Sequence, residues 1–169
     1  MSDIIISGYH GFANSGDEAL LYAMLNELRK KRPDIDVTVL SKIPDETADE
    51  YGVKSVFRYN YFKIKKEMKN AGMLIFGGGS LLQDVTSSKS ILYYLGIIAL
   101  AKRCGLKIML YANGIGPIVK KHNRILAARV LNSVDIITLR DDRSDEELKN
   151  LGVTKPEIII TADPAFTID

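Results

Sequence analysis

The sequence predicts an α/β protein with a Rossmann-like, doubly wound and mostly parallel sheet of about seven strands. Short apolar runs recur along the chain, and most intervals between them carry a helical pattern. One run, Met73-Leu74-Ile75-Phe76, is continuously apolar and ends in glycines, which is typical of a strand buried on both faces of a parallel sheet. Glycine-rich or polar segments follow several of these runs, as binding loops do at the carboxyl ends of such strands.

The composition fits one soluble domain covering residues 1–169. The chain is 46% hydrophobic and 26% charged, and its 23 basic and 21 acidic residues give a net charge of +2. The sequence has no long block of like charges that would indicate a nucleic-acid partner. The one cysteine, Cys104, excludes an internal disulfide framework and a multi-cysteine metal site. We expect it to be a core residue of an apolar helix in a reducing compartment.

We expect a cytoplasmic protein without a transmembrane segment. Residues 1–3 lead directly into the first apolar run, without the charged region and apolar core of a secretory signal. The most apolar helical stretch, Ile91 to Ala101, is too short to span a bilayer.

The expected elements alternate along the chain. Strands are predicted at residues 4–6, 37–40, 53–57, 73–76, 108–111, 136–139 and 158–160. Leu20, Met24 and Leu28 recur at helical spacing, and Pro33 ends that helix. A weaker pattern predicts a helix over residues 118–130, and the basic cluster at residues 63–69 indicates a solvated helix face. The alternation predicts right-handed crossovers with helices on both faces of the sheet.

A glycine-rich loop follows the first strand and opens a helix. Its spacing is not the G-x-G-x-x-G of dinucleotide sites, and Ser15-x-x-Glu18 forms a capping-box pattern. Asp17 adds a second carboxylate in the first helical turn, which opposes a phosphate but suits a sugar hydroxyl. We therefore predict a substrate-binding segment formed by Asn14, Ser15, Gly16, Asp17 and Glu18. Helix capping alone is the competing interpretation.

The stretch after the fourth strand is the strongest candidate for a binding loop. Gly77 is expected to mark the carboxyl end of that strand, and three glycines leave the backbone open to a ligand. The candidate substrate-binding residues here are Gly77, Gly78, Gly79, Ser80, Gln83, Asp84, Thr86 and Ser87. A plain strand-to-helix turn is the alternative, with Ser87 or Ser88 capping a helix that begins near Ser90.

Two further strands end in similar segments. Residues 112–117 after the fifth strand contribute the candidates Asn113, Gly114 and Gly116. Arg140 follows the sixth strand, where its guanidinium could face a cleft, and Ser144-x-x-Glu147 is a second capping-box pattern. The alternative role for Arg140 is an ion pair with Asp84, Asp141 or Asp163. Ser144 and Asp163 complete the set of candidate substrate-binding residues.

With residues 161–164 after the last strand, five such segments lie at one edge of the sheet and indicate one shared cleft. Of the two histidines, His10 could reach this cleft and His122 lies on an apparent surface. The sequence contains no serine nucleophile elbow, no P-loop lysine motif and no clustered metal-ligand spacing, so we expect no metal site.

Taken together, five ordered motifs resemble the polysaccharide pyruvyl transferase family, and most closely its bacterial cell-wall branch. The motifs are residues 8–19, residues 77–87, residues 111–117, Arg140-Asp141-x-x-Ser144 and Ala162-Asp163-Pro164. The resemblance implies an architecture like that of GT-B glycosyltransferases, with the site between two Rossmann-like halves. Members transfer the enolpyruvyl unit of phosphoenolpyruvate to two sugar hydroxyls as a cyclic ketal and release phosphate, without a separate cofactor.

The same resemblance implies a lipid-linked cell-wall polysaccharide precursor as acceptor, with N-acetylmannosamine as the modified sugar. The modified polymer anchors S-layer proteins, and the lipid-linked substrate would place the protein at the inner membrane face. The sequence corresponds to the amino-terminal, acceptor-side half, so a missing carboxy-terminal domain is an implied partner. The donor-binding histidine and lysine of that half have no counterpart, and the chain alone is expected to be inactive.

Residue roles follow from the motif positions. Asn14, Asp17 and Glu18 would line the acceptor side, and Arg140 would reach the carboxylate or phosphate of the donor. Asp17 and Arg140 are therefore the catalytic candidates, with Asp17 as the base that takes a proton from the attacking hydroxyl. Two other functions stay open from the sequence: half of a GT-B nucleotide-sugar glycosyltransferase, and a non-catalytic sugar-binding module.

Overall fold

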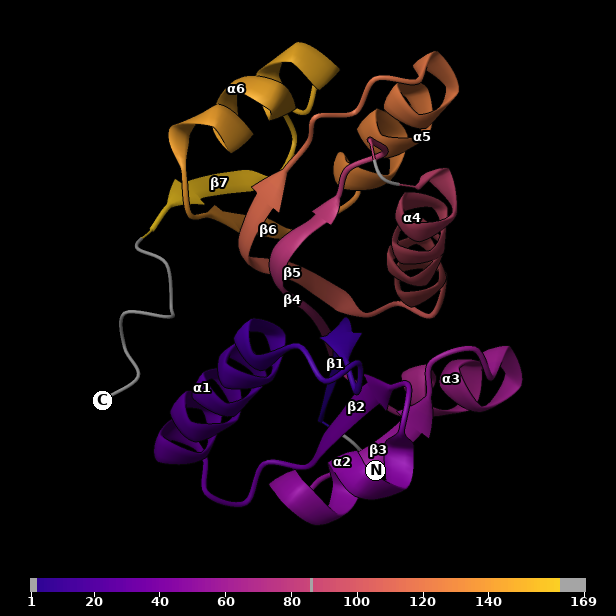
Figure 1. Ribbon diagram of the computed structural model, residues 1–169, viewed down its shortest axis with the longest axis vertical. Coiled ribbons are helices and arrows are strands. Elements are labelled where there is room, and N and C mark those ends of the chain that lie inside the picture. The colour runs from indigo at the N-terminus through magenta and orange to yellow at the C-terminus, as the bar shows by residue number, and fades with distance from the viewer. Residues whose placement is uncertain (1–2, 86, 162–169) are drawn as a thin grey trace.

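The computed structural model describes residues 3–85 and 87–161 (Figure 1). Strands and helices alternate along the whole described chain. The strands are β1 (Ile4–His10), β2 (Val37–Ser41), β3 (Lys54–Phe57), β4 (Met73–Leu82), β5 (Lys107–Ile115), β6 (Ile136–Leu139) and β7 (Glu157–Ile160). The helices are α1 (Ser15–Lys31), α2 (Pro44–Tyr51), α3 (Tyr61–Met68), α4 (Ser88–Arg103), α5 (Lys121–Leu131) and α6 (Asp142–Leu151).

The seven strands form one sheet in the order β3-β2-β1-β4-β5-β6-β7. Every described pairing is parallel, which confirms the Rossmann-like, doubly wound α/β fold. The strand order reverses between β1 and β4, where the chain crosses from β3 by way of α3. Ligands of doubly wound sheets bind outside the carboxyl ends of the strands near such a reversal.

Alternating side chains divide the core into two layers. Ile4 and Ile6 of β1 pack with α1 and α2 in the smaller cluster, which includes Met24 and Tyr51. Ile5, between them in sequence, packs in the larger cluster, to which α3, α4, α5 and α6 contribute. Because successive strand residues point to opposite faces, this division shows that both faces of the sheet are covered. Figure 1 shows α1 and α4 on opposite sides of the central strands.

Two central strands are longer than the sequence predicts. Gly77 does not end β4, which continues to Leu82, and β5 continues through the expected loop to Ile115. The two extensions pair with each other, with Gly79 opposite Asn113 and Leu82 opposite Ile115. A register shift between Gly79 and Leu82 accommodates the positive φ angles at the glycines. The prediction that glycine terminates these strands was therefore wrong, because the backbone pairing continues past it.

The helix starts also differ from the capping-box predictions. Asn14, not Ser15, is the N-cap of α1, and its side chain accepts hydrogen bonds from the Gly16 and Asp17 amides. Asp141 rather than Ser144 caps α6, where its carboxylate accepts the Ser144 amide at 2.8 Å. Asn and Asp are as favourable as Ser at the N-cap position. In both helices the cap is the Asn or Asp that precedes the serine in the chain.

Other helix boundaries are close to those predicted. Ser87 caps α4 by accepting the Lys89 amide, as one alternative had it. The helix expected from residue 118 begins three residues later, at Lys121. Cys104 is half-buried at the carboxyl end of α4 and packs against the larger core cluster. Within residues 3–85 and 87–161, every helix is too short or too polar to cross a bilayer.

Candidate functional site

An open groove of about 750 Å³ lies at the carboxyl edge of β4, β5 and β6. Four residues singled out from the sequence line it: Ser80, Gly114, Gly116 and Ser144. The first turns of α6 add Asp142, Arg143 and Glu147, of which only Glu147 was singled out from the sequence, as part of a capping-box pattern. Only the spacing of the Ser144 motif pointed to this part of the chain. Three strand ends and one helix start therefore form a single concave surface.

Arg140 joins two of these strand ends. Its Nη2 donates a 2.9 Å hydrogen bond to Ser80 Oγ, across 60 positions of sequence. A Cβ on Gly114 would lie 2.7 Å from Ser80 Oγ and 3.4 Å from Arg140 Nε, so glycine is needed for this close approach. The Asp141 carboxylate, one of the ion-pair partners that the sequence allowed, lies 4.0 Å from Nε. The partly exposed guanidinium of Arg140 lies beside the groove, bonded to Ser80 of its lining.

Asp17 approaches the same edge from the start of α1. A Cβ on Gly79 would lie 3.2 Å from Asp17 Oδ1, so the carboxylate sits directly against β4. Burial raises the pKa of Asp17, the neighbouring Glu18 raises it further, and Arg140 lowers it. The effect of Arg140 shows that the two predicted catalytic side chains are electrostatic neighbours. A half-buried carboxylate with a raised pKa is a more effective proton acceptor than an ordinary surface aspartate.

Glu18 has a different environment from Asp17. Its Oε1 accepts the Gly11 amide at 2.8 Å, and its Oε2 accepts the Tyr51 hydroxyl at 3.1 Å. Both oxygens are thus engaged in tying the loop after β1 to α1 and α2. Asn14, Ser15 and Gly16 are exposed at the helix start. Within the predicted segment, Glu18 therefore positions the loop after β1, whereas Asn14, Ser15 and Gly16 face solvent.

The glycines of β4 allow α1 to pack closely against the strand. A side chain at Gly77 would collide with Met24, and one at Gly78 would overlap Leu20. Gly78 and Gly79 also have positive φ angles of 49° and 73°. Leu20 and Met24 of α1 therefore lie against these glycines, and substrate binding at Gly77 and Gly78 stays a prediction.

Asp84 is a buried structural carboxylate. It accepts hydrogen bonds from the Val119 amide at 2.8 Å, the Lys120 amide at 3.0 Å and the Asn123 side chain at 2.8 Å. Burial works to raise the pKa of Asp84, but these donors and the charge of Lys120 outweigh it and lower the pKa. Its bonds hold the loop after β4 to the segment that opens α5.

The remaining predicted residues lie at varied depths. Asn113 is fully buried and donates to the Phe76 and Tyr111 carbonyls. Ser144 is also buried, where its hydroxyl donates to Asp141 and accepts the Ile115 amide. Gln83 accepts the Val85 amide next to the turn before α4. Thr86 and Asp163 lie outside the described residues.

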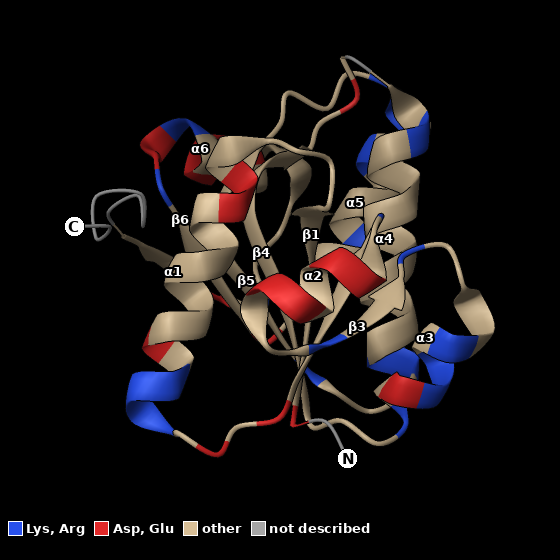
Figure 2. Cartoon of the chain, turned by 60° about the horizontal axis from the view of Figure 1, so that its bottom comes forward, with Lys and Arg blue, Asp and Glu red and all other residues tan. Residues whose placement is uncertain are grey.

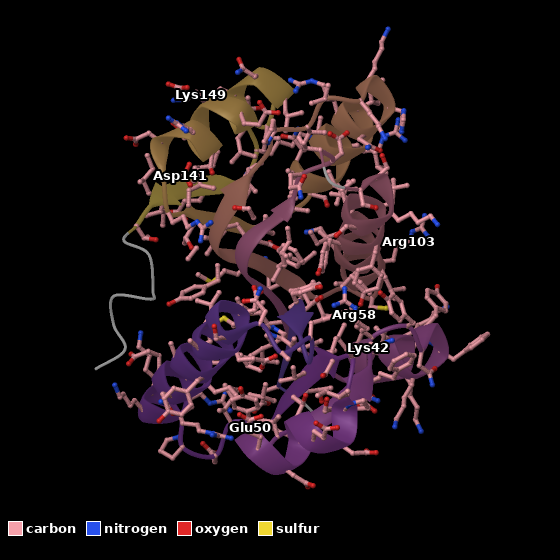
Figure 3. The ribbon with its side chains drawn as sticks, in the orientation of Figure 1. Lys42, Glu50, Arg58, Arg103, Asp141 and Lys149 are labelled. Atoms are coloured by element: carbon pink, nitrogen blue, oxygen red, sulfur yellow. The ribbon has the colours of Figure 1, made fainter. Side chains whose placement is uncertain are left out.

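His10 does not reach the cleft. It is 1% exposed and lies near Arg58, a buried arginine that donates to the Gly8 carbonyl and the Tyr94 hydroxyl. Figure 3 shows Arg58 between the sheet and α4. Burial and the charge of Arg58 lower the pKa of His10 to about 4. Arg58 was not predicted from the sequence, because its position directly after a short strand does not indicate that it is buried. In the described ranges, no three acidic, histidine or cysteine side chains are placed to hold a metal ion.

Comparison with known proteins agrees with this arrangement of motifs. The amylovoran biosynthesis protein AmsJ of Erwinia amylovora is 22% identical to this chain over an alignment that covers 98% of the chain and 49% of AmsJ. The chain thus spans about half the length of this relative. The family described as polysaccharide pyruvyl transferase matches residues 14–169. Because that match covers nearly the whole sequence, the chain belongs to the polysaccharide pyruvyl transferase family.

Proposed function

We propose that the protein contributes the acceptor side of an enzyme that transfers pyruvate from phosphoenolpyruvate to a saccharide as a ketal. The observation that carries the proposal is that Asp17 lies against Gly79 while Arg140 is hydrogen-bonded to the adjacent Ser80, at the carboxyl edge of the sheet. A reaction between a sugar hydroxyl and an anionic donor needs a proton acceptor and a cation. Asp17 supplies the proton acceptor, and Arg140, bonded to Ser80 of the groove lining, supplies the cation.

The residues have separate tasks in this reaction. Asp17 takes the proton from the attacking sugar hydroxyl, and the oxygen bonds to the central carbon of the enolpyruvyl group while the enol CH₂ carbon gains a proton. Attack by a second hydroxyl of the same sugar then displaces phosphate, which leaves with the proton of that hydroxyl, and closes the ketal. Arg140 holds the donor carboxylate or phosphate through parallel hydrogen bonds. The group that protonates the enol carbon belongs, in this proposal, to a second domain.

The finer identity of the acceptor and the architecture are part of the same proposal. The acceptor is a lipid-linked cell-wall polysaccharide precursor, with N-acetylmannosamine as the modified sugar and S-layer anchoring as the use of the product. The chain forms the amino-terminal half of a GT-B-like enzyme, works at the cytoplasmic face of the membrane and needs no metal or separate cofactor. The family and the name of AmsJ support a role in polysaccharide synthesis.

The test is a transfer assay with phosphoenolpyruvate and N-acetylmannosaminyl acceptors, comparing this chain with a longer enzyme that adds the carboxy-terminal half. The longer enzyme should release phosphate and form an acid-labile ketal. Both activities should persist after divalent ions are chelated. The isolated chain should unfold cooperatively but show no turnover. Turnover by the chain alone would contradict the two-half proposal. Saturable binding of a sugar nucleotide without any response to phosphoenolpyruvate would identify a glycosyltransferase instead.

A further inference from the structure

An exposed aromatic surface lies around the edge strand β3 and the start of α3, away from the groove at β4, β5 and β6. It is formed by Phe57, Tyr59, Tyr61, Phe62 and Leu92, and we call it the β3–α3 surface. Phe62 is 85% exposed, and Tyr59 and Tyr61 are each more than half exposed. Large apolar side chains gathered in this way are uncommon on a surface that contacts only water, so they indicate a binding face.

The rings form a continuous surface rather than scattered contacts. Tyr59 lies edge-on to Phe57, with centroids 5.6 Å apart, and to Tyr93 at 5.3 Å. Tyr61 and Phe62 are 5.9 Å apart. Tyr59, Tyr61, Leu92 and Tyr93 line a shallow groove of about 270 Å³ between the start of α3 and α4. The surface thus offers both projecting rings and an apolar depression.

Lysines surround these rings. Lys42 Nζ lies 5.5 Å from the centre of the Phe57 ring, and Lys65 Nζ lies 6.0 Å from that of Tyr61. The other exposed lysines of α3 and its end are Lys63, Lys66 and Lys69. Figure 2 shows blue segments and one red segment, Glu67, on this helix, whereas the charged segments of α2 are red. Since the whole chain has a net charge of only +2, the positive charge is concentrated locally on this surface.

We propose that the β3–α3 surface docks on a bilayer containing anionic phospholipids. Tyrosine and phenylalanine rings place their apolar bodies at the boundary between headgroups and acyl chains. Lysines extend toward anionic headgroups while their methylene stems lie along the apolar boundary. A soluble anionic polymer would use the lysines but would leave Phe62 in water, and that exposed ring decides in favour of the bilayer.

Docking would orient the candidate active site. Phe57 ends β3 and Ser80 lies near the end of β4, so the β3–α3 surface and the groove share the carboxyl edge of one parallel sheet. A bilayer held at this edge would bring a lipid-linked acceptor to the groove. This consequence rests on the proposed function, whereas docking itself needs neither donor nor acceptor. Membrane docking and the proposed transferase function can therefore be tested separately.

The first test is flotation of the chain with vesicles of phosphatidylglycerol and phosphatidylcholine, compared with phosphatidylcholine alone, without any substrate. We expect association with the anionic vesicles that weakens as salt is added. Phe62→Ser should reduce the bound fraction several-fold. The matched control is Ile125→Ser, because Ile125 is 57% exposed on α5, away from this surface. No association at low salt, or equal losses in both variants, would overturn the proposal.

The second test separates local charge from total charge. Lys65→Glu with Lys66→Glu should lower the partition coefficient about tenfold or more, since each lysine near an anionic surface contributes several-fold. Lys121→Glu with Lys155→Glu changes the net charge equally at exposed positions elsewhere and should have a much smaller effect. Circular dichroism checks that all variants are folded. Equal effects of the two pairs, or binding of soluble acidic polysaccharide in place of vesicles, would contradict membrane docking.

Discussion

Asp17 at the start of α1 and Asp84 after β4 are two carboxylates at the same edge of the sheet, with opposite environments. Three donors surround Asp84 and favour its charged form. For Asp17, burial and Glu18 disfavour the charged form, and Arg140 only partly offsets them. The sequence presents both as acids in polar segments beside glycines. A carboxylate that accepts several hydrogen bonds has a lowered pKa and stabilises the fold. A carboxylate that is partly buried with few donors has a raised pKa and is suited to accept a proton.

The largest expected effect distinguishes the two acids by activity. In the enzyme that adds the proposed carboxy-terminal half, Asp17→Asn should lower the rate of ketal formation by about 10²–10⁴-fold, since it removes the general base. The melting temperature at pH 7 should stay the same or rise, because burial disfavours the ionised carboxylate. Asp45→Asn is the control, since Asp45 occupies the first turn of α2 and is exposed. Unchanged turnover in Asp17→Asn would remove Asp17 from the mechanism.

A second variant tests whether α1 packs too closely on β4 to allow a side chain at Gly78. Gly78→Ala should lower the free energy of unfolding by about 2–4 kcal/mol, since the new Cβ would overlap Leu20 at a positive φ. Urea denaturation measures this change. Gly96→Ala is the contrast, because no atom lies within 4 Å of its added Cβ and it lies in α4. Gly96→Ala should be neutral or slightly stabilising. Similar losses in both variants would show that close packing under α1 is not what selects glycine.

The third prediction assigns Asp84 to stability alone. Asp84→Ala should cost about 1.5–3 kcal/mol, because it leaves the Val119 and Lys120 amides without their acceptor. Since the folded-state pKa of Asp84 is lowered from 3.8, its contribution is complete above that pH and is lost as pH falls through the lower folded-state value. Stability curves from pH 7 to pH 2 should therefore converge for wild type and variant in acid. A normal melting temperature with lost donor affinity would instead make Asp84 a ligand.

Local patterns predicted the fold well because most strands are dense apolar runs and most of the intervals between them carry a helical pattern. They misplaced the ends of β4 and β5, since glycine ends many strands but here makes room for α1 and for Ser80. The site was harder to predict because its contacts cross long stretches of chain. Arg140 reaches Ser80, and Asp84 is bonded by Asn123, neither of which a pattern of a few residues can reveal.

The most direct test of the account is Arg140→Lys in the enzyme with both proposed halves, measured as the apparent Michaelis constants for phosphoenolpyruvate and for the sugar acceptor. Lysine keeps the charge but not the fork of parallel donors. The account predicts a much larger increase in the constant for phosphoenolpyruvate than in that for the acceptor, with nearly the same melting temperature. An unchanged constant for phosphoenolpyruvate, together with a large loss of stability, would contradict the account and make Arg140 a structural residue of the β4–β6 edge.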